Sequence, residues 1–393
     1  MAKKNESGYL SAKESRRISR ENRKITDQFE KLHKRKNVPE EEFLTQMHDQ
    51  NNSLEIENLH TYFFSDVGTV RAVDGVSFDV PIGKTVGVVG ESGCGKSVTS
   101  LSIMQLLQRP QGQVVEGEIR LNLGNGKAYD ITKTPIEQMQ KLRGNYMSMI
   151  FQEPMTSLNP VFSVKKQLSE PFIIHQGMSK KEAAAKCIEM LKAVQIPNPE
   201  AVAKQYPHQL SGGMRQRVMI AMALACKPDI LIADEPTTAL DVTIQAQILR
   251  LMNDLQKENG TSIMFITHDL GVINEMADDV VVMYCGQVVE QAPARVIFTD
   301  CKKSHPYTEG LMYSIPRLND DRKKLDPIPG AVPHPLDLPK GCKFAPRCKY
   351  CTQKCIDAEP ELKQVAEGQF VRCFYPDKEE RRSAEHGKIV VHY

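Results

Sequence analysis

Apolar residues along the 393-residue chain fall into short blocks whose spacing indicates strands and helices. At both ends of the segment 54–80, apolar and polar positions alternate, which is the pattern of half-buried antiparallel strands. Four later runs are short and continuously apolar, and they occupy residues 85–89, 147–151, 230–233 and 262–266. A strand that is apolar on both faces is typical of the middle of a parallel sheet. We therefore expect an antiparallel β layer beside a mostly parallel α/β core.

Helices are predicted between these strands from apolar residues that recur every three or four positions. One helix begins near Ser97 and stops before Pro110, and another covers residues 244–255 and is closed by Gly260. Residues from about 155 to 225 are also mostly helical by this criterion. We expect the segment 155–225 to form a helical subdomain inserted into the core.

The N-terminal segment, residues 1–50, is rich in lysine and arginine and contains few apolar residues. Its composition is typical of a solvated, flexible extension, partly helical or disordered. The alternative is a weak attachment of its basic side chains to anionic lipid headgroups, and the sequence does not decide between the two.

The overall composition is that of a soluble globular protein with room for one large domain and a smaller one. Hydrophobic residues make up 40% and charged residues 25%, and the net charge of +2 gives no reason to expect a nucleic-acid partner. The longest apolar run, residues 218–226, is about half of what a membrane-spanning helix needs, and the N-terminus is too charged for a secretory signal peptide. Ten cysteines in such a chain indicate reduced thiols or metal ligands, and we expect an intracellular protein.

Residues 90–97 match the phosphate-binding loop pattern of glycine, four residues, then glycine-lysine-serine. The loop lies between a predicted strand and a predicted helix, so its backbone N–H groups and the helix N-terminus would point at a phosphate. Lys96 would reach the β- and γ-phosphates, and the Ser97 hydroxyl would ligate Mg²⁺. We expect the nucleotide to contact the whole turn, which consists of Gly90, Glu91, Ser92, Gly93, Cys94, Gly95, Lys96, Ser97 and Val98.

Polar side chains follow three of the buried strands at the edge where a nucleotide would bind. Asp234 and Glu235 end the strand at 230–233, and two adjacent acids there are costly unless they serve a cation and its chemistry. Asp234 suits the Mg²⁺ shell, and Glu235 suits a base that polarises water for attack on the γ-phosphate. Gln152 would touch Mg²⁺ or the attacking water, and His268 would sense the γ-phosphate.

A second potential anion site begins at Ser211, which is placed to cap the helix that follows. Gly212 and Gly213 behind it expose free N–H groups at a positive helix end. An ordinary capped helix is the alternative interpretation of the same residues.

An aromatic cluster, Tyr62-Phe63-Phe64, lies about thirty residues before the lysine of the phosphate loop. Such residues usually fill a core, but one of them can also stack on a purine ring. We favour Phe63 for this contact, with Tyr62 as the second candidate.

Together these motifs resemble those of the ATP-binding cassette (ABC) transporter ATPases over about residues 52–300. The discriminating element is Leu-Ser-Gly-Gly-x-x-Gln at residues 210–216, because phosphate loops occur in many NTPases. The resemblance implies a P-loop NTPase cassette in which two copies sandwich two ATPs head to tail, each signature contacting the ATP held by the other copy. It adds five residues to the expected nucleotide site: Ser211, Gly212, Gly213, Gln216 and Asp241.

Further segments resemble the oligopeptide and dipeptide importer ATPases, specifically their D-type subunit, over about residues 52–375. They are residues 152–160, 305–308, 328–330 and 341–344. The resemblance implies that residues 301–375 form a C-terminal domain of this importer type, followed by a tail at 376–393.

What this narrower resemblance implies is an ATPase that drives peptide uptake from the cytoplasmic face of the cell membrane. Its partners would be a second homologous ATPase, two transmembrane permeases and an extracellular peptide-binding protein. Nickel importers share this architecture, so nickel or another small solute is the alternative cargo.

Five cysteines crowd a proline-rich segment near the C-terminus: Cys342, Cys348, Cys351, Cys355 and Cys373. A zinc site favours two close pairs of cysteines, and only one, Cys348 and Cys351, is present. Three clustered thiols plus a distant one suit an iron–sulfur cluster comparably well. The third interpretation is that the thiols bind no metal. The family resemblance implies a [4Fe-4S] cluster on Cys342, Cys348, Cys355 and Cys373, with Cys351 as an additional thiol. Either zinc or an iron–sulfur cluster would cross-link and so stabilise a region that lacks a hydrophobic core of its own.

Two other classes of function compete with transport. Soluble cassette proteins that act on ribosomes or DNA usually carry two cassettes or a long coiled coil, and this chain has one cassette and no sustained heptads. In the other class, the cysteine segment senses redox state and the cassette is secondary.

Overall fold

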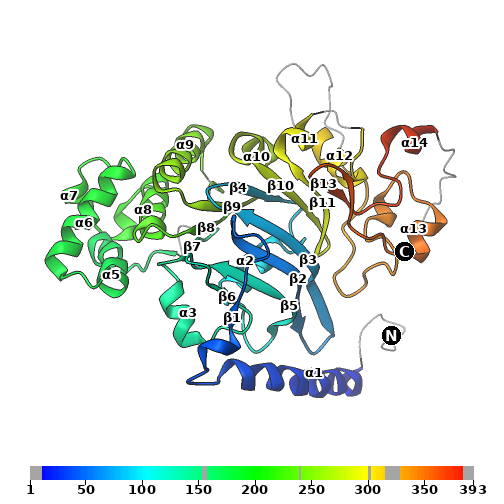
Figure 1. Ribbon diagram of the computed structural model, residues 1–393, viewed down its shortest axis with the longest axis horizontal. Coiled ribbons are helices and arrows are strands. Elements are labelled where there is room, and N and C mark those ends of the chain that lie inside the picture. Colours follow the sequence, from blue (N-terminus) through cyan, green and yellow to red (C-terminus); the bar gives the residue numbers. More distant parts are fainter. Residues whose placement is uncertain (1–10, 153–156, 239, 300–301, 315–327, 384–393) are drawn as a thin grey trace.

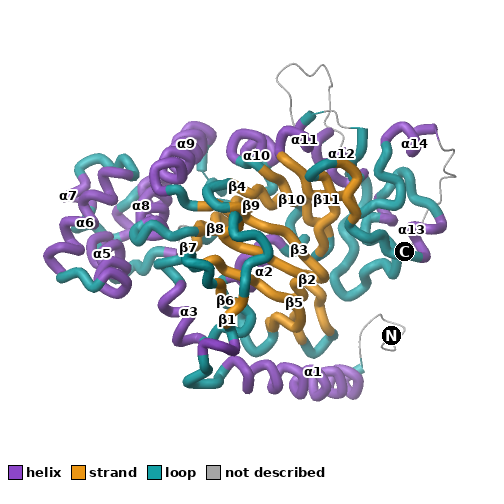
Figure 2. The backbone as a smooth tube through the Cα atoms, viewed as in Figure 1, coloured by secondary structure: helices purple, strands orange, loops and turns teal. Residues whose placement is uncertain are grey.

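The computed structural model describes residues 11–152, 157–238, 240–299, 302–314 and 328–383. Two β-sheets occupy the middle of the molecule, with a group of helices at one end and the C-terminal region at the other (Figure 1). Most helices lie around the outside of the strands, as Figure 2 shows. Among the described helices, none is both long and apolar enough to cross a membrane.

The first sheet is antiparallel and has the strand order β1-β6-β5-β2-β3. Its strands are β1 (Leu44–Thr45), β2 (Asn52–Phe64), β3 (Thr69–Pro81), β5 (Gly112–Asn122) and β6 (Ala128–Asp130). Leu54 and Ile56 of β2 lie opposite Val80 and Phe78 of β3, and all four side chains are buried. The alternating residues therefore form the inner face of this sheet, as their period of two predicts.

The second sheet has eight strands in the order β12-β13-β11-β10-β4-β9-β8-β7. The strands from β10 to β7 run parallel to one another, and β11, β13 and β12 add an antiparallel edge. In chain order the strands are β4 (Thr85–Val89), β7 (Met147–Ile150), β8 (Ile230–Asp234), β9 (Ser262–Thr267), β10 (Asp279–Tyr284), β11 (Gln287–Pro293), β12 (Lys363–Ala366) and β13 (Gln369–Val371). The four apolar runs of the sequence are thus neighbouring strands of one sheet.

Alternate residues of the central strands enter two different hydrophobic cores. In β8, Ile230 and Ile232 join the core between the two sheets, whereas Leu231 and Ala233 join the core beneath the helices. All four side chains are at most 1% exposed. Because both faces of the strand are covered, an apolar side chain is favoured at each position, and the alternation seen in the first sheet is lost.

The helices that cover these cores are α2 (Lys96–Ile103), α3 (Ile136–Leu142), α9 (Val242–Asn259), α10 (Leu270–Met276) and α11 (Ala294–Phe298). Helix α2 ends earlier than its periodicity predicts, because Gln105 has a φ of 48°, outside the helical range. The Arg143 guanidinium donates to the carbonyl oxygens of Met104 and Gln105, at 2.9 and 3.0 Å, and so satisfies groups that the helix leaves open.

Among the described residues, four helices form the subdomain at the left of Figure 1: α5 (Val164–Gln176), α6 (Lys180–Ala193), α7 (Pro199–Val202) and α8 (Gly212–Leu224). Serine hydroxyls cap three of them, with Ser163 before α5, Ser179 before α6 and Ser211 before α8. These caps explain why the helices begin where they do, since each serine accepts a hydrogen bond from a backbone N–H of the first turn.

The N-terminal extension, which its composition predicts to be flexible and partly helical or disordered, contains one long helix among its described residues. Residues Ala12–His33 form helix α1, which lies along the antiparallel sheet, and a short 3₁₀ turn, Glu40–Glu42, follows (Figure 1). The Asn22 amide donates to the Ser65 carbonyl oxygen at 2.7 Å, and Arg109 and Gln113 each donate to the Glu30 carboxylate at 3.0 Å. Helix α1 docks through hydrogen bonds of polar residues, which an apolar periodicity does not reveal.

The C-terminal region continues the cassette rather than standing apart from it. Its β12–β13 hairpin adds to the main sheet, with Val371 of β13 opposite Glu290 of β11. Arg381 lies in the segment expected to be a tail, yet it is 2% exposed and pairs with Glu309. The helices of this region are α12 (Pro306–Tyr313), the 3₁₀ turn η3 (Ala345–Arg347), α13 (Gln353–Asp357) and α14 (Lys378–Ser383).

Candidate nucleotide-binding and hydrolysis site

The phosphate loop connects β4 to α2, as the motif requires. Gly95 has a φ of 107°, and a Cβ there would come within 2.5 Å of the Ala72 carbonyl oxygen. A Cβ at Gly90 would come within 2.2 Å of the Met283 carbonyl oxygen. Both positions therefore require glycine, because the loop is pressed between β3 and β10.

Lys96 is 5% exposed, and its ammonium group folds back over the loop. Its Nζ donates to the carbonyl oxygens of Gly90, at 2.7 Å, and Glu91, at 3.2 Å. These bonds hold the positive charge at the mouth of the loop, where a β- or γ-phosphate would accept from the same group.

Ser97 and Asp234 lie together at the carboxyl edge of the parallel strands. The Ser97 hydroxyl donates to Asp234 Oδ1 at 3.1 Å. Burial raises the pKa of the Asp234 carboxyl, and the hydrogen bond from Ser97 only partly offsets this. The partly exposed Ser97 hydroxyl and the buried Asp234 carboxylate are ligands suited to Mg²⁺, whose charge would favour the ionised acid.

Glu235 is the centre of a cluster of polar side chains. Gln152 Nε2 donates to Glu235 Oε2 at 3.0 Å, the Thr238 hydroxyl donates to the same oxygen at 3.0 Å, and His268 Nδ1 lies 3.2 Å from Oε1. Burial alone would raise the pKa of this carboxyl, but the hydrogen bonds from His268 and Thr238 outweigh it and lower the pKa. The carboxylate is therefore ionised and oriented, which is the state that a general base needs.

The backbone of Glu235 is itself unusual, with a φ of 47°. A non-glycine residue in this left-handed region costs free energy, and such residues cluster at functional sites. The next residue, Pro236, accepts a hydrogen bond from Gln216 Nε2 through its carbonyl oxygen. Helix α8 is thereby tied to the loop that carries the carboxylate.

Sequence reasoning brought Gln152, Asp234, Glu235 and His268 to the same edge of the sheet, and the structure places them there. It missed Thr238, which the sequence shows only as part of a turn. The signal available was its position three residues after Glu235, because a hydroxyl at that spacing can reach back across a turn.

The signature residues divide between exposed and buried positions. Ser211 and Gly212 are exposed at the start of α8, where the Ser211 hydroxyl accepts from the Met214 N–H at 3.3 Å. Gly213 is partly covered, and a Cβ there would lie 3.1 Å from Ile244. Gln216 is 1% exposed and points into the molecule, so the structure separates it from the exposed turn.

Asp241 caps α9 by accepting hydrogen bonds from the N–H groups of Thr243 and Ile244, at 3.1 and 3.0 Å. Its carboxylate sits at the positive end of an 18-residue helix. In this chain its visible contacts are therefore structural, and its expected contact with nucleotide would be to another copy or partner.

The aromatic candidates differ in their surroundings. The Tyr62 hydroxyl donates to Asp74 at 2.7 Å, and Arg71 lies over the ring at 5.6 Å. Burial and the Asp74 bond raise the pKa of Tyr62 to about 12. Phe63 is half-buried and packs against Gly112, where a Cβ would come within 2.9 Å of its ring. Tyr62 is already engaged on both its polar and its aromatic surfaces, which leaves Phe63 as the better candidate for a purine.

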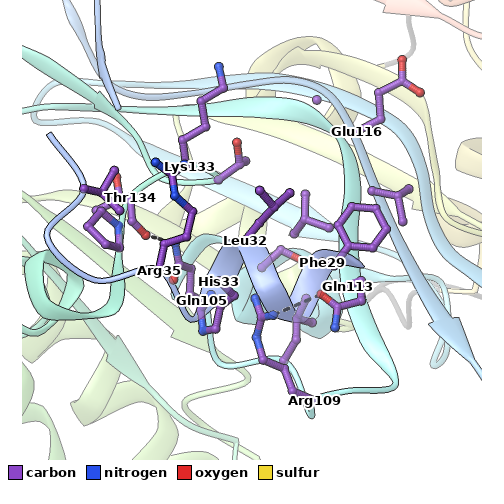
Figure 3. Close-up of a pocket in the computed structure, with 18 of the residues that line it drawn as sticks. Phe29, Leu32, His33, Arg35, Gln105, Arg109, Gln113, Glu116, Lys133 and Thr134 are labelled. Atoms are coloured by element: carbon purple, nitrogen blue, oxygen red, sulfur yellow. Dashed lines mark hydrogen bonds between the residues drawn. The ribbon is translucent and has the colours of Figure 1, made fainter. Parts of the chain in front are cut away.

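A cavity of about 470 Å³ lies between α1 and the antiparallel sheet (Figure 3). Figure 3 shows Phe29, His33 and Arg109 along its wall, and none of the predicted site residues line it. Burial, and then the charge of Arg109, lower the pKa of His33 to about 4, so this imidazole is neutral near pH 7. Arg109 is already paired with Glu30. The cavity belongs to the seam through which α1 docks and not to the nucleotide site.

Four of the five C-terminal cysteines line one small cavity: Cys342, Cys348, Cys355 and Cys373. The fifth, Cys351, is not in its lining. As the described side chains stand, no group of three or more His, Cys, Asp or Glu residues has an arrangement that could hold a metal ion. The described cysteines are free thiols.

Arg381 lines the same cavity and is 2% exposed. Its Nε and Nη1 are buried without a hydrogen-bond partner in the described structure. The Tyr375 N–H donates to Cys373 Sγ at 3.4 Å. A negatively charged thiolate in this cavity would accept hydrogen bonds from the unpaired Arg381 donors and from the N–H that points at sulfur.

The sheet topology, the phosphate loop and the Glu235 cluster together define an ABC-type ATPase cassette, as the sequence predicted. The dimeric cassette MJ0796 in a post-hydrolysis state bound to ADP and Pi superimposes with a TM-score of 0.54 at 28% identity, covering 62% of this chain and 99% of that one. CbiO1 from Clostridium perfringens, part of the transporter complex cbiONQ, gives 0.53 at 27% identity, covering 64% and 92% of the two chains.

The model of the ABC transporter family matches residues 73–238, and that of the oligopeptide/dipeptide transporter C-terminal region matches residues 289–355. The oligopeptide transport ATP-binding protein AppD of Bacillus subtilis is 53% identical over 326 residues, which are 83% of this chain and 97% of AppD. The dipeptide transport ATP-binding protein DppD of Escherichia coli is 45% identical over 323 residues, which are 82% and 96%. The chain belongs to the ATP-binding proteins of the ABC transporter family, and it is an ATPase.

Proposed function

We propose that this chain is the ATP-hydrolysing subunit of an importer of oligopeptides or dipeptides, acting at the cytoplasmic face of the cell membrane. Support for the cargo comes from the match to the oligopeptide/dipeptide C-terminal region and from relatives named for peptide transport. The observation that carries the ATPase mechanism is the Glu235 carboxylate held by three polar side chains beside the Ser97–Asp234 pair.

In the proposed mechanism the loop residues 90–98 wrap the phosphates while Phe63 stacks on the base. Mg²⁺ held by Ser97, Asp234 and Gln152 would neutralise charge on the phosphate oxygens. Lys96 would donate to the β- and γ-phosphates. The attacking water would then meet the face of the γ-phosphate that lies toward Glu235.

Glu235 accepts a proton from the attacking water on that face. Gln152 orients the water, and His268 donates to the γ-phosphate while its other contact fixes the carboxylate. The exposed turn of α8, with Ser211, would bind the ATP held by a partner cassette. ATP binding then closes the pair, and hydrolysis removes the contacts and lets it reopen.

Members of the family power transporters and therefore work with membrane-spanning permeases. The partners that we propose in detail are two permeases, a second homologous ATPase and an extracellular peptide-binding protein. Nickel or another small solute is the second candidate cargo, because the architecture that the sequence resembles is shared by nickel importers. A soluble cassette without transport is less well supported, since the relatives named above are named for transport.

The test is the substitution Glu235→Gln in the assembled complex with its permeases. We expect ATP to remain bound and turnover to fall by about 10² to 10⁴, because the amide cannot accept the proton of the attacking water. Peptide uptake into vesicles should fall in parallel. Glu258→Gln is the matched control, since this glutamate is exposed near the end of α9. Undiminished hydrolysis in Glu235→Gln would refute the role of base, and uptake of nickel but not peptide would overturn the cargo.

We also propose that the four cysteines that share one cavity, Cys342, Cys348, Cys355 and Cys373, hold a [4Fe-4S] cluster, with zinc as the alternative. The support is their convergence, the exclusion of Cys351 from the same cavity, and the unpaired donors of Arg381. When bound, the cluster would supply bonds between distant segments of the C-terminal region. Arg381 would then donate to a thiolate sulfur and balance its negative charge.

A further inference from the structure

The C-terminal region reaches the phosphate loop through a single arginine. Arg347 Nη1 donates to Glu91 Oε2 at 2.6 Å, and Nη2 donates to Glu91 Oε1 at 3.0 Å. The two residues are 256 positions apart in the chain. This is a bidentate arginine–carboxylate pair, which is among the stronger and more directional contacts in proteins.

The guanidinium is held from several sides at once. Its Nε donates to the Pro329 carbonyl oxygen at 3.1 Å, and Nη2 also donates to that of Ile328 at 3.3 Å. Nη1 lies 3.4 Å from the Tyr284 hydroxyl. The side chain of Arg347 is 3% exposed, whereas that of Glu91 is 31% exposed. Arg347 is therefore the fixed member of the pair, and Glu91 is the member that it positions.

A second contact fixes the backbone of the same loop residue. The Glu91 N–H donates to the Tyr307 hydroxyl at 2.8 Å. Tyr307 is fully buried and packs against Tyr284 and Phe344, with ring centroids 4.7 and 5.5 Å apart. Because this N–H is turned toward α12, the orientation of the first peptide of the loop is set from outside the loop.

The charge of Glu91 gives the contact a function in ATP binding. A carboxylate in a loop that receives a triphosphate repels the ligand, and the repulsion is large in a partly buried site. Arg347 neutralises that carboxylate and draws it toward the C-terminal region. Without the arginine, the same loop would present a negative charge beside the phosphates.

The arginine lies in the turn η3, between two of the cysteines that share a cavity. Cys348 follows it directly, and Cys342 lies five residues before it. The Ala345 N–H of η3 donates to the Cys342 carbonyl oxygen at 3.0 Å, and the Cys342 N–H donates to the Cys355 carbonyl oxygen at 2.8 Å, so η3 is tied to α13 through Cys342. The conformation of the cysteine segment therefore determines where the guanidinium stands.

We infer that Arg347 is a positioning residue of the phosphate loop, and that through Arg347 and Tyr307 the C-terminal region sets the affinity of this subunit for ATP. The inference uses the ATPase activity of the family and does not depend on the cargo or on a metal in the cysteine cavity. An intact C-terminal region is then a condition for tight nucleotide binding.

The test compares Arg347→Ala, Glu91→Gln and the double variant in the purified full-length chain by equilibrium binding of ATP and, in the complex, by kcat and KM. Arg347→Ala leaves a charged carboxylate unpaired, so we expect the Kd and the KM for ATP to rise about tenfold with kcat changed much less. The double variant has no such charge and should recover most of the affinity. Independent, additive losses would overturn the inference.

Arg372→Ala is the matched control. Arg372 also precedes a cavity cysteine, Cys373, and its guanidinium donates to carbonyl oxygens of Val288 and Pro360, not to the loop. It should change thermal stability without changing the Kd for ATP. An equal loss of affinity in this variant would show a general effect of destabilising the C-terminal region and would contradict the specific role.

A second variant keeps the inference testable if Arg347→Ala does not fold. Tyr307→Phe removes only the hydroxyl that accepts from the Glu91 N–H and retains the aromatic packing. We expect weaker ATP binding with a nearly native melting temperature. If Tyr307→Phe binds ATP as the native chain does, α12 does not position the loop backbone for nucleotide binding.

Discussion

At the scale of single residues, the chemistry of this protein is concentrated in the oxygen atoms of one carboxylate. Glu235 accepts from an amide, a hydroxyl and an imidazole, and these contacts come from three different elements of the sheet edge. Two of these contacts, those of His268 and Thr238, also lower the pKa of Glu235 and so stabilise its ionised form against the effect of burial. The same cluster of side chains therefore both orients the Glu235 carboxylate and keeps it ionised.

The pH dependence of hydrolysis tests the effect of the cluster on the ionisation of Glu235. Thr238→Ala removes a hydrogen bond that stabilises the carboxylate, so the pKa of Glu235 should rise toward its ordinary value. Because the base works only when ionised, the acid limb of the kcat–pH profile should then move to higher pH, while activity at alkaline pH changes little. The profile of the assembled complex measures this. A limb that moves to lower pH, or does not move, would contradict the assigned role of the hydroxyl.

The residues around the phosphate could be predicted because each one lies at the end of a recognisable strand or in a short motif. Asp234, Gln152 and His268 follow apolar runs, and parallel neighbours end at one edge of a sheet. Arg347 and Tyr307 could not be predicted in the same way. They meet Glu91 across 256 and 216 positions, and no periodicity records such a contact.

At the scale of elements, helix starts carry much of the function. Ser211 and Ser179 cap α8 and α6 by accepting a hydrogen bond from the backbone N–H of the third helical residue, and at α6 the Glu182 side chain also accepts from the Ser179 N–H. Only the first cap is followed by two glycines, which leave N–H groups open at the surface. The two helices can therefore be compared: the Ser179 cap stabilises its helix, whereas the Ser211 cap is also proposed to bind the ATP of the partner cassette.

We expect Ser211→Ala and Ser179→Ala to destabilise the chain by a similar amount, about 1 kcal/mol each, because each removes one cap. Ser211→Ala should in addition weaken ATP-dependent association of the two ATPase subunits and lower hydrolysis. Thermal melts and sedimentation with ATP would measure the two effects. Equal association of both variants would show that the turn at Ser211 is an ordinary cap.

Helix α1 and the strands show what pattern analysis resolves at this scale. The parallel strands β4, β7, β8 and β9 were predicted because they are continuously apolar, and in β8 the two faces are indeed buried in different cores, whereas the neighbouring strand β10 was not predicted. The docking of helix α1 was not predicted, because segment 1–50 is highly charged and the helix contacts the cassette through Asn22 and Glu30. Polar docking depends on partners that only the folded chain brings close.

At the scale of the whole molecule, the C-terminal region is joined to the cassette through contacts that include the following three. The β12–β13 hairpin extends the main sheet, the Tyr307 hydroxyl accepts from the Glu91 N–H, and Arg347 holds the Glu91 carboxylate of the phosphate loop. Between these places, residues 328–362 contain only short helical turns among the described residues. A cross-link among the cysteines would contribute most in such a segment, because it restricts a long stretch of chain that has little core.

The whole-molecule prediction is that loss of one cavity cysteine loosens all three attachments. Cys348→Ser should lose bound iron and visible absorbance in anaerobically purified protein, lower the melting temperature and weaken ATP binding through the neighbouring Arg347. Cys351→Ser is the control, since Cys351 is buried nearby but does not line the cavity, and it should keep all three properties. Stoichiometric zinc in the native protein would show that the four cysteines hold zinc and not an iron–sulfur cluster. Equal metal content and equal stability in the two variants would show that the cavity cysteines hold no metal. If Cys348→Ser loses ATP affinity together with the metal, the cysteine cavity and the phosphate loop are coupled. The physical link is the turn η3, which carries Arg347 and is followed directly by Cys348.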